Sequence, residues 1–96
     1  MLVIFSYDVN TEDLKGRTRL RRVAKLCEKN GQRVQKSVFE CLLEPARLVA
    51  LKGALLKVMD SKKDSLRVYY LGSSWERRVE HFGAGEGYNP EGTIIM

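Results

Sequence analysis

Short runs of β-branched and aromatic residues alternate along this chain with segments in which apolar residues recur every three or four positions. The runs predict β-strands, and the helical spacing predicts amphipathic helices. The resulting order is strand, helix, strand, strand, helix, strand. A chain of 96 residues has room for only one hydrophobic core. All of these elements are therefore expected to pack around the same core.

Two segments carry the helical spacing. The apolar stripe of the first is formed by Leu20, Val23, Ala24 and Cys27. Gly31 is the expected end of this helix. The second helix is expected to start at Glu44-Pro45, because proline is tolerated in the first turn. Its apolar stripe is formed by Leu48, Leu51, Leu55 and Val58.

Strands are expected at residues 2–9, 33–43 and 66–71, with weaker candidates at 77–82 and 93–96. Residues 33–43 form either two strands or one long bent strand, because no Asn-Gly type turn separates their halves. A charged loop is expected at residues 60–64, and a glycine-rich connector at 83–92.

This order of elements is that of the ferredoxin-like βαββαβ fold, an α+β fold, here with one or two extra C-terminal strands. Residues 1–82 are expected to form the domain, and residues 83–96 a flexible connector and a C-terminal strand that pairs with a partner subunit. Both helices would cover one face of the sheet, which leaves Leu2 and Ile4 on the other face. An apolar sheet face needs a cover, so we predict a homodimer packed sheet to sheet.

Positive charge is concentrated in residues 15–36, where nine basic residues face the single acid Glu28. The segment carries +8, whereas the whole chain carries +5. A solvated helix face is one interpretation, and binding to the phosphates of nucleic acid is the other. The candidate nucleic-acid-binding residues are Arg17, Arg19, Arg21, Arg22 and Lys25.

The remaining composition excludes several classes of protein. No apolar run approaches the roughly 20 residues that a membrane helix needs, and no basic segment precedes the apolar run that begins at Leu2. We expect a cytoplasmic protein without a membrane partner. Cys27 and Cys41 lack a CxxC or a histidine cluster, so they are expected to be buried free thiols.

Asp8 is the strongest candidate for chemistry. The only histidine, His81, lies in a weak strand and suits no Ser/His/Asp or Cys/His mechanism. Asp8 ends an apolar strand on the same face as Leu2 and Ile4. One interpretation is a turn-capping residue. The other is a metal ligand, because a two-fold axis near this strand end would pair two Asp8 carboxylates as oxygen ligands for Mg²⁺.

Several segments together carry a resemblance to a known family. They are the apolar run ending in Tyr7-Asp8, the basic helix, the stretch Arg33-Val34-Gln35-Lys36-Ser37-Val38-Phe39-Glu40, and the strand Asp64-Ser65-Leu66-Arg67-Val68-Tyr69. Over nearly the whole chain they resemble the small CRISPR-associated adaptation nuclease, the second of the two universal spacer-acquisition proteins. The resemblance implies a ferredoxin-like homodimer, Mg²⁺-dependent cleavage of RNA or double-stranded DNA, and partnership with the larger adaptation integrase.

The resemblance also implies roles for particular residues. Asp8 would bind the metal, and the active region would contain Tyr7, Arg22, Arg33, Ser37 and Phe39. Arg17 and Arg19 lie in what the resemblance treats as a longer, variable approach to the first helix.

Two other functions stay open at this point. One is a non-catalytic dimeric scaffold that binds DNA within the integrase complex, and the other is a related ferredoxin-like ribonuclease toxin. The sequence identifies no general base, so cleavage is expected to be slow or conditional. It does not separate RNA from DNA as the substrate.

Overall fold

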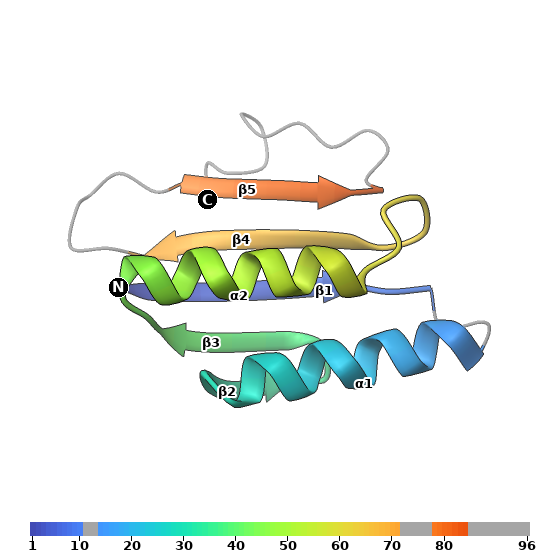
Figure 1. Cartoon of the computed structure of the whole chain (residues 1–96), viewed down its shortest axis with the longest axis horizontal. Coiled ribbons are helices and arrows are strands. Elements are labelled where there is room, and N and C mark those ends of the chain that lie inside the picture. The colour runs from blue at the N-terminus through green and yellow to red at the C-terminus, as the bar shows by residue number, and fades with distance from the viewer. Residues whose placement is uncertain (11–13, 72–77, 85–96) are drawn as a thin grey trace.

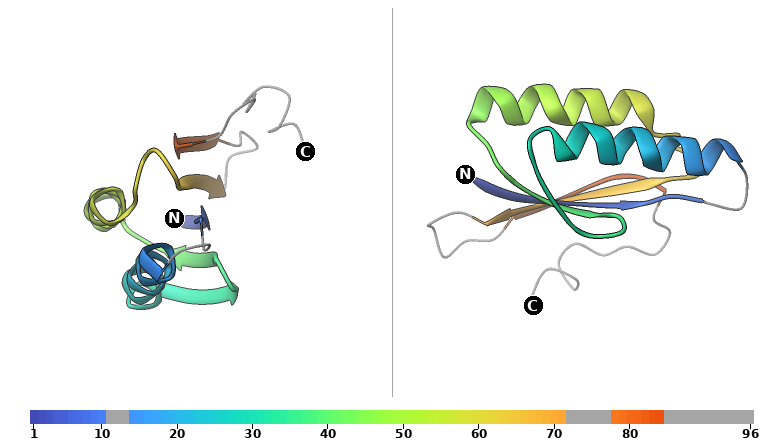
Figure 2. Two further views of the ribbon diagram at one scale, coloured as in Figure 1. Left: turned by 90° about the vertical axis from the view of Figure 1, so that its right-hand side faces the viewer. Right: turned by 90° about the horizontal axis from the view of Figure 1, so that it is seen from below.

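The computed structural model describes residues 1–10, 14–71 and 78–84. One five-stranded antiparallel sheet carries both helices on the same face (Figures 1 and 2). Its strand order is β2-β3-β1-β4-β5. The elements are β1 (Leu2–Asp8), α1 (Leu14–Glu28), β2 (Gly31–Gln35), β3 (Val38–Leu42), α2 (Pro45–Val58), β4 (Ser65–Leu71) and β5 (Arg78–Gly83). This is the ferredoxin-like α+β arrangement, extended by β5 at one edge.

The core lies between the sheet and the two helices. Alternate residues of β1, namely Val3, Phe5 and Tyr7, are buried on the helix side. The stripes expected for the two helices are confirmed, because Leu20, Val23, Ala24 and Cys27 are buried on α1, and Leu48, Leu51 and Leu55 are buried on α2. Val58 packs against this core while partly exposed.

The first helix starts earlier than its apolar stripe suggested. Gly16 is buried in the first turns of α1 and extends the stripe one turn toward the N-terminus. Arg17 and Arg19 therefore lie inside α1, not in an approach to it. The other end also differs, because α1 ends at Glu28 and Gly31 begins β2.

Gly31 serves close packing of strands instead of helix termination. A Cβ at this position would lie 2.7 Å from the Cα and the Sγ of Cys41 on β3, and would overlap the Glu40 carbonyl oxygen. Residues 33–43, for which the sequence allows one strand or two, form the separate strands β2 and β3, with an irregular register between Arg33 and Gln35.

The face of the sheet away from the helices carries several apolar residues. Leu2 and Ile4 lie there half-buried, and the antiparallel register pairs Leu2 with Leu42 and Leu71, and Ile4 with Tyr69. Leu42 is 75% exposed. The expected cover by a second subunit stays a prediction. The expected strand at 93–96, the glycine-rich connector beyond Ala84 and their pairing with a partner lie outside the described residues.

Within the described ranges, neither helix has the length and hydropathy to cross a bilayer.

Candidate functional site

Asp8 is the last residue of β1, and its side chain is exposed. The alternation along β1 places it on the sheet face away from the helices, together with Leu2 and Ile4. Its register partner is Ser65, the first residue of β4. The structure thus places this carboxylate at the end of the central strand, in contact with solvent.

The turn between β2 and β3 lies beside this strand end. The backbone N–H of Tyr7 donates to the carbonyl of Ser37 at 2.9 Å, so Ser37 borders the residue before Asp8. Arg33 holds the same turn, because its Nε donates to the carbonyl of Lys36 at 2.8 Å and its Nη2 donates to the same oxygen. The C-terminal end of β1, which is Asp8, and the first turns of α1 lie toward the same end of the sheet (Figure 1).

The other residues assigned to the active region lie on the helix side of the sheet. Phe39 is fully buried, and its register partner Arg33 faces the same side, toward α1. Tyr7 is also buried there. The structure therefore brings Arg33 together with Phe39 and the basic helix, and leaves Asp8 on the opposite face.

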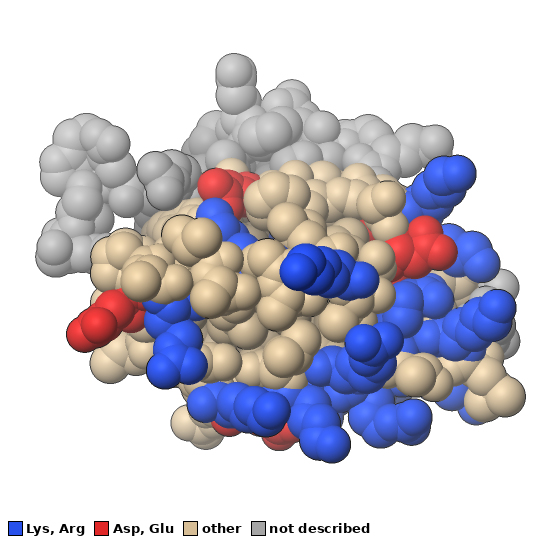
Figure 3. Space-filling model, in the orientation of Figure 1, with Lys and Arg blue, Asp and Glu red and all other residues tan. Residues whose placement is uncertain are grey.

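A cationic groove of about 450 Å³ runs between α1 and β2. Its floor is formed by Leu20 and Ala24, which belong to the core. Its charged walls are formed by Arg17, Arg21, Arg22, Lys25, Glu28 and Arg33. Lys and Arg side chains gather over α1 on the face shown in Figure 3. Five cations and one acid therefore line a single groove, which suits a chain of phosphates.

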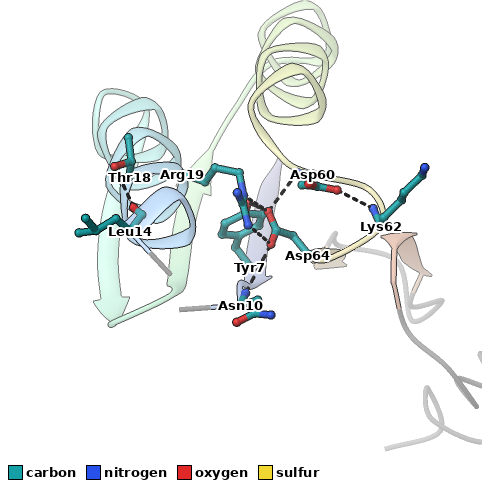
Figure 4. A network of polar contacts seen from close by, with 8 residues as sticks. All are labelled: Tyr7, Asn10, Leu14, Thr18, Arg19, Asp60, Lys62 and Asp64. Carbon is teal, nitrogen blue, oxygen red and sulfur yellow. Dashed lines mark hydrogen bonds and ion pairs between the residues drawn. The ribbon is translucent and has the colours of Figure 1, made fainter. Parts of the chain in front are cut away.

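Arg19 stands apart from the other arginines of α1. Its guanidinium forms a two-point contact with the buried Asp64, through Nε to Oδ2 at 2.6 Å and Nη2 to Oδ1 at 3.0 Å. The Tyr7 hydroxyl donates to the same carboxylate (Figure 4). Tyr7 and Arg19, both of which the sequence analysis assigned to the site, are thus bound to the buried Asp64 carboxylate.

Asp64 is the member of this region that sequence reasoning missed. It stands in a highly charged segment whose composition predicts a solvated loop, yet its relative exposure is 0%. Burial alone would raise the pKa of the Asp64 carboxyl, but hydrogen bonds from Arg19, Tyr7 and two backbone N–H groups lower that pKa below its usual range. Burial and the hydrogen bond to Asp64 raise the pKa of Tyr7, so its hydroxyl keeps its proton.

Metal binding by one chain alone is not supported by its donor set. Within the described segments no three His, Cys, Asp or Glu side chains cluster in a way that could hold a metal ion. Asp8 offers one exposed carboxylate of the oxygen chemistry that Mg²⁺ prefers. It therefore fits as one half of a site that a second subunit would complete.

Fold and groove together define a small α+β protein with a cationic groove and an acidic residue at the end of its central strand. The pattern of the family described as CRISPR associated protein Cas2 matches residues 1–79. The chain belongs to this family.

Known relatives match over the full chain. The CRISPR-associated endoribonuclease Cas2 of Chlorobaculum tepidum is 59% identical, with 100% of both chains covered. The protein of the same name from Nitratidesulfovibrio vulgaris strain Hildenborough is 56% identical over 100% of this chain and 94% of its own. The crystal structure of Streptococcus pyogenes Cas2 at pH 6.5 superposes with a TM-score of 0.74 and 56% identity, over 78% of this chain and 90% of the other.

Proposed function

We propose that this chain is a CRISPR-associated endonuclease that cleaves phosphodiester bonds as a homodimer and uses Mg²⁺. The observation that carries the proposal is the placement of an exposed Asp8 at the same end of the sheet where the basic helix begins. The names of the relatives, CRISPR-associated endoribonuclease, favour RNA as the first substrate to test. Membership in this family favours a CRISPR role over that of a ribonuclease toxin.

The groove supplies binding. Arg17, Arg21, Arg22, Lys25 and Arg33 line it together. Their charges attract the phosphate backbone irrespective of base sequence, since phosphate contacts position a nucleic acid without reading it. The guanidinium of Arg33 is oriented by its hydrogen bonds to the Lys36 carbonyl and by its contact with the Phe39 ring.

Asp8 supplies the chemistry. Two copies, one from each subunit, would hold Mg²⁺, which supplies positive charge for the scissile phosphate and lowers the pKa of a bound water. Tyr7 does not act on the substrate in this proposal, because its hydroxyl is buried and donates to Asp64. The only histidine of the sequence, His81, lies on β5, two strands away from Asp8 on β1. No side chain is therefore assigned as a general base, and we expect slow turnover.

Dimerisation would bury the apolar face that carries Leu2, Ile4 and Leu42 and would bring the two Asp8 residues toward a common axis. We also propose partnership with the larger CRISPR adaptation integrase, for which the basic dimer would present bound duplex DNA.

The test is a nuclease assay on wild type and Asp8→Asn, with RNA and duplex DNA, with and without Mg²⁺. We expect cleavage by wild type only with the metal, and at least a hundredfold loss in Asp8→Asn, because the amide lacks the charge that holds the ion. Glu44→Gln is the matched control, since Glu44 is an exposed acid before α2 with no capping hydrogen bond. Equal activity of wild type and Asp8→Asn would refute the assignment.

A non-catalytic scaffold is the second candidate function. It is favoured by the groove, whose cations need no contribution from Asp8. An Asp8→Asn variant that binds duplex DNA, associates with the integrase and supports spacer acquisition as wild type does would show that bridging, and not cleavage, is the cellular role.

A further inference from the structure

The Asp64 carboxylate accepts five hydrogen bonds, which use both of its oxygens. Oδ2 accepts from the Tyr7 hydroxyl, from Arg19 Nε at 2.6 Å and from the Asp60 backbone N–H at 3.0 Å. Oδ1 accepts from Arg19 Nη2 at 3.0 Å and, over a longer 3.4 Å, from the backbone N–H of Asn10. Every partner is a donor, so the site is built for a charged carboxylate.

The donors come from three separate parts of the chain that meet at Asp64 (Figure 4). Tyr7 belongs to β1, and Asn10 follows directly after that strand. Arg19 lies on α1, which carries the cations of the groove. Asp60 lies between α2 and β4. The contacts with Tyr7 and Asn10 bracket Asp8, because one precedes it and the other lies two residues beyond it.

Ser65, the residue after Asp64, also lies beside Asp8. Ser65 is the register partner of Asp8 in the β1–β4 ladder. Asp64, which directly precedes β4, thus contacts the chain on both sides of Asp8, through the Tyr7 side chain and the Asn10 backbone N–H. The same carboxylate binds α1 through a planar two-point contact with Arg19, which fixes both direction and distance.

We propose that Asp64 is a positioning residue that fixes the Asp8 strand end against the basic helix, so that the catalytic carboxylate and the phosphate-binding groove keep one relative position. This inference rests on the proposed function, because it assigns Asp64 a part in that reaction. Misplacement of a reacting group by about 1 Å costs roughly a hundredfold in rate. Because Asp64 joins β1 to α1, we expect it to increase the rate of cleavage as well as the stability of the fold.

A purely structural ion pair is the competing explanation, and the protein contains a matched example of one. Glu80 on β5 accepts from Tyr70 Oη at 2.6 Å and from Lys52 Nζ at 3.0 Å. This second cluster has the same chemistry, a tyrosine, a cation and a carboxylate. It joins α2 to β4 and β5, whereas the Asp64 cluster joins the end of β1 to α1.

The experiment compares Asp64→Asn with Glu80→Gln in the 96-residue chain, with RNA as substrate and Mg²⁺ present. Both changes remove one negative charge, and both replace one acceptor oxygen by an NH₂ donor while the other oxygen stays. The two variants therefore have the same net charge, and the affinity of each for nucleic acid is measured separately. For Asp64→Asn we expect a kcat about ten- to a hundredfold below wild type, with KM changed less than about twofold. For Glu80→Gln we expect kcat within about twofold of wild type. The melting temperature of each variant is measured in parallel.

Tyr7→Phe and Tyr70→Phe form a second matched pair that removes a single donor and keeps each carboxylate. They carry the test if Asp64→Asn fails to fold. Tyr7→Phe is expected to lower kcat by a smaller factor than Asp64→Asn, and Tyr70→Phe is expected to leave kcat unchanged. Amide hydrogen exchange at Asn10 should quicken in Asp64→Asn and stay unchanged in Glu80→Gln.

The outcomes separate this inference from the proposed function. If wild type and Asp8→Asn have equal activity, the proposed function is refuted and the role of Asp64 in it is refuted too. If Asp8→Asn is inactive while the Asp64 and Tyr7 variants retain the kcat of their matched controls, only the positioning role is refuted. A loss of kcat confined to the Asp64 and Tyr7 variants supports it.

Discussion

The guanidinium carbon of Arg33 lies 5.6 Å from the centre of the Phe39 ring. The same guanidinium donates twice to the carbonyl of Lys36 and so closes the turn between β2 and β3. Arg33 also forms one wall of the cationic groove. One side chain therefore joins the buried core, the turn beside Tyr7 and the surface that would meet phosphate.

Replacing Arg33 by lysine should separate charge from geometry. Lysine keeps the positive charge but lacks the planar fork that holds the Lys36 carbonyl and stacks on Phe39. We expect affinity for nucleic acid to fall several-fold while the salt dependence of binding stays as in wild type. Arg33→Ala should in addition lower the slope of log affinity against log salt by about one. Equal affinity of Arg33→Lys and wild type would contradict this role.

The groove should dominate binding by release of counterions. We expect Arg21→Ala/Arg22→Ala/Lys25→Ala to flatten the slope of log affinity against log salt across unrelated sequences, by about 0.7 to 0.9 for each phosphate that the variant no longer neutralises. The control removes the same charge from exposed cations that do not line this groove, Arg47, Lys57 and Lys62. Fluorescence anisotropy over a salt series measures both. Similar slopes for the two triple variants would mean that binding depends on the net charge of the protein and not on the groove.

Two glycines should respond oppositely to alanine. At Gly31 a Cβ would press on the backbone of Glu40 and Cys41, so Gly31→Ala should destabilise the protein by about 1–3 kcal/mol. At Gly53, inside α2, a Cβ has nothing within 4 Å, so Gly53→Ala should stabilise the protein by about 0.5–1 kcal/mol. Chemical denaturation gives both values. Destabilisation by Gly53→Ala would show that α2 packs differently.

Much of the fold could be predicted from spacing because it depends on local pattern. The alternation along β1 correctly separated Val3, Phe5 and Tyr7 from Leu2 and Ile4. The start of α1 could not be predicted in this way, because Gly16 has no apolar side chain and is buried only through packing. The packing role of Gly31 could not be predicted for a similar reason, since it depends on how closely β3 approaches β2.

The candidate site was predictable only in part. The family resemblance pointed to Asp8, and the charge count pointed to α1. Asp64 carried no local signal, because its partners Tyr7 and Arg19 lie 57 and 45 residues away in sequence. A carboxylate between serine and two lysines resembles any solvated loop until tertiary contacts are known.

The buried thiols of Cys27 and Cys41 should be unreactive in the native protein. They should also lower the free energy of unfolding at alkaline pH. Burial, together with the nearby Cys41 and Glu28, raises the pKa of the Cys27 thiol from 9.0 to about 12, and burial also raises the pKa of Cys41. Below pH 9 both states keep the proton, so stability is unaffected. Above pH 9 the unfolded chain ionises first, so stability falls until the folded thiol also ionises. For Cys27 we expect a loss of about 1 kcal/mol per pH unit above pH 9, measured by denaturation between pH 7 and 10. The Cys27→Ala variant should have a shallower slope, and an identical slope would rule out this assignment.

The last prediction concerns the charge of Asp8 in the dimer. If sheet-to-sheet packing brings two Asp8 carboxylates together, they repel each other when no cation lies between them. Asp8→Asn should then tighten the metal-free dimer, and Mg²⁺ should tighten the wild-type dimer while leaving the variant unchanged. Sedimentation equilibrium with EDTA or with Mg²⁺ measures the four dissociation constants, and Glu44→Gln again serves as a control that removes a distant acid. Mg²⁺ that strengthens the wild-type and Asp8→Asn dimers equally would show that the ion acts elsewhere on the protein. An 11.0 kDa monomer at micromolar concentration under all conditions would contradict the shared metal site altogether.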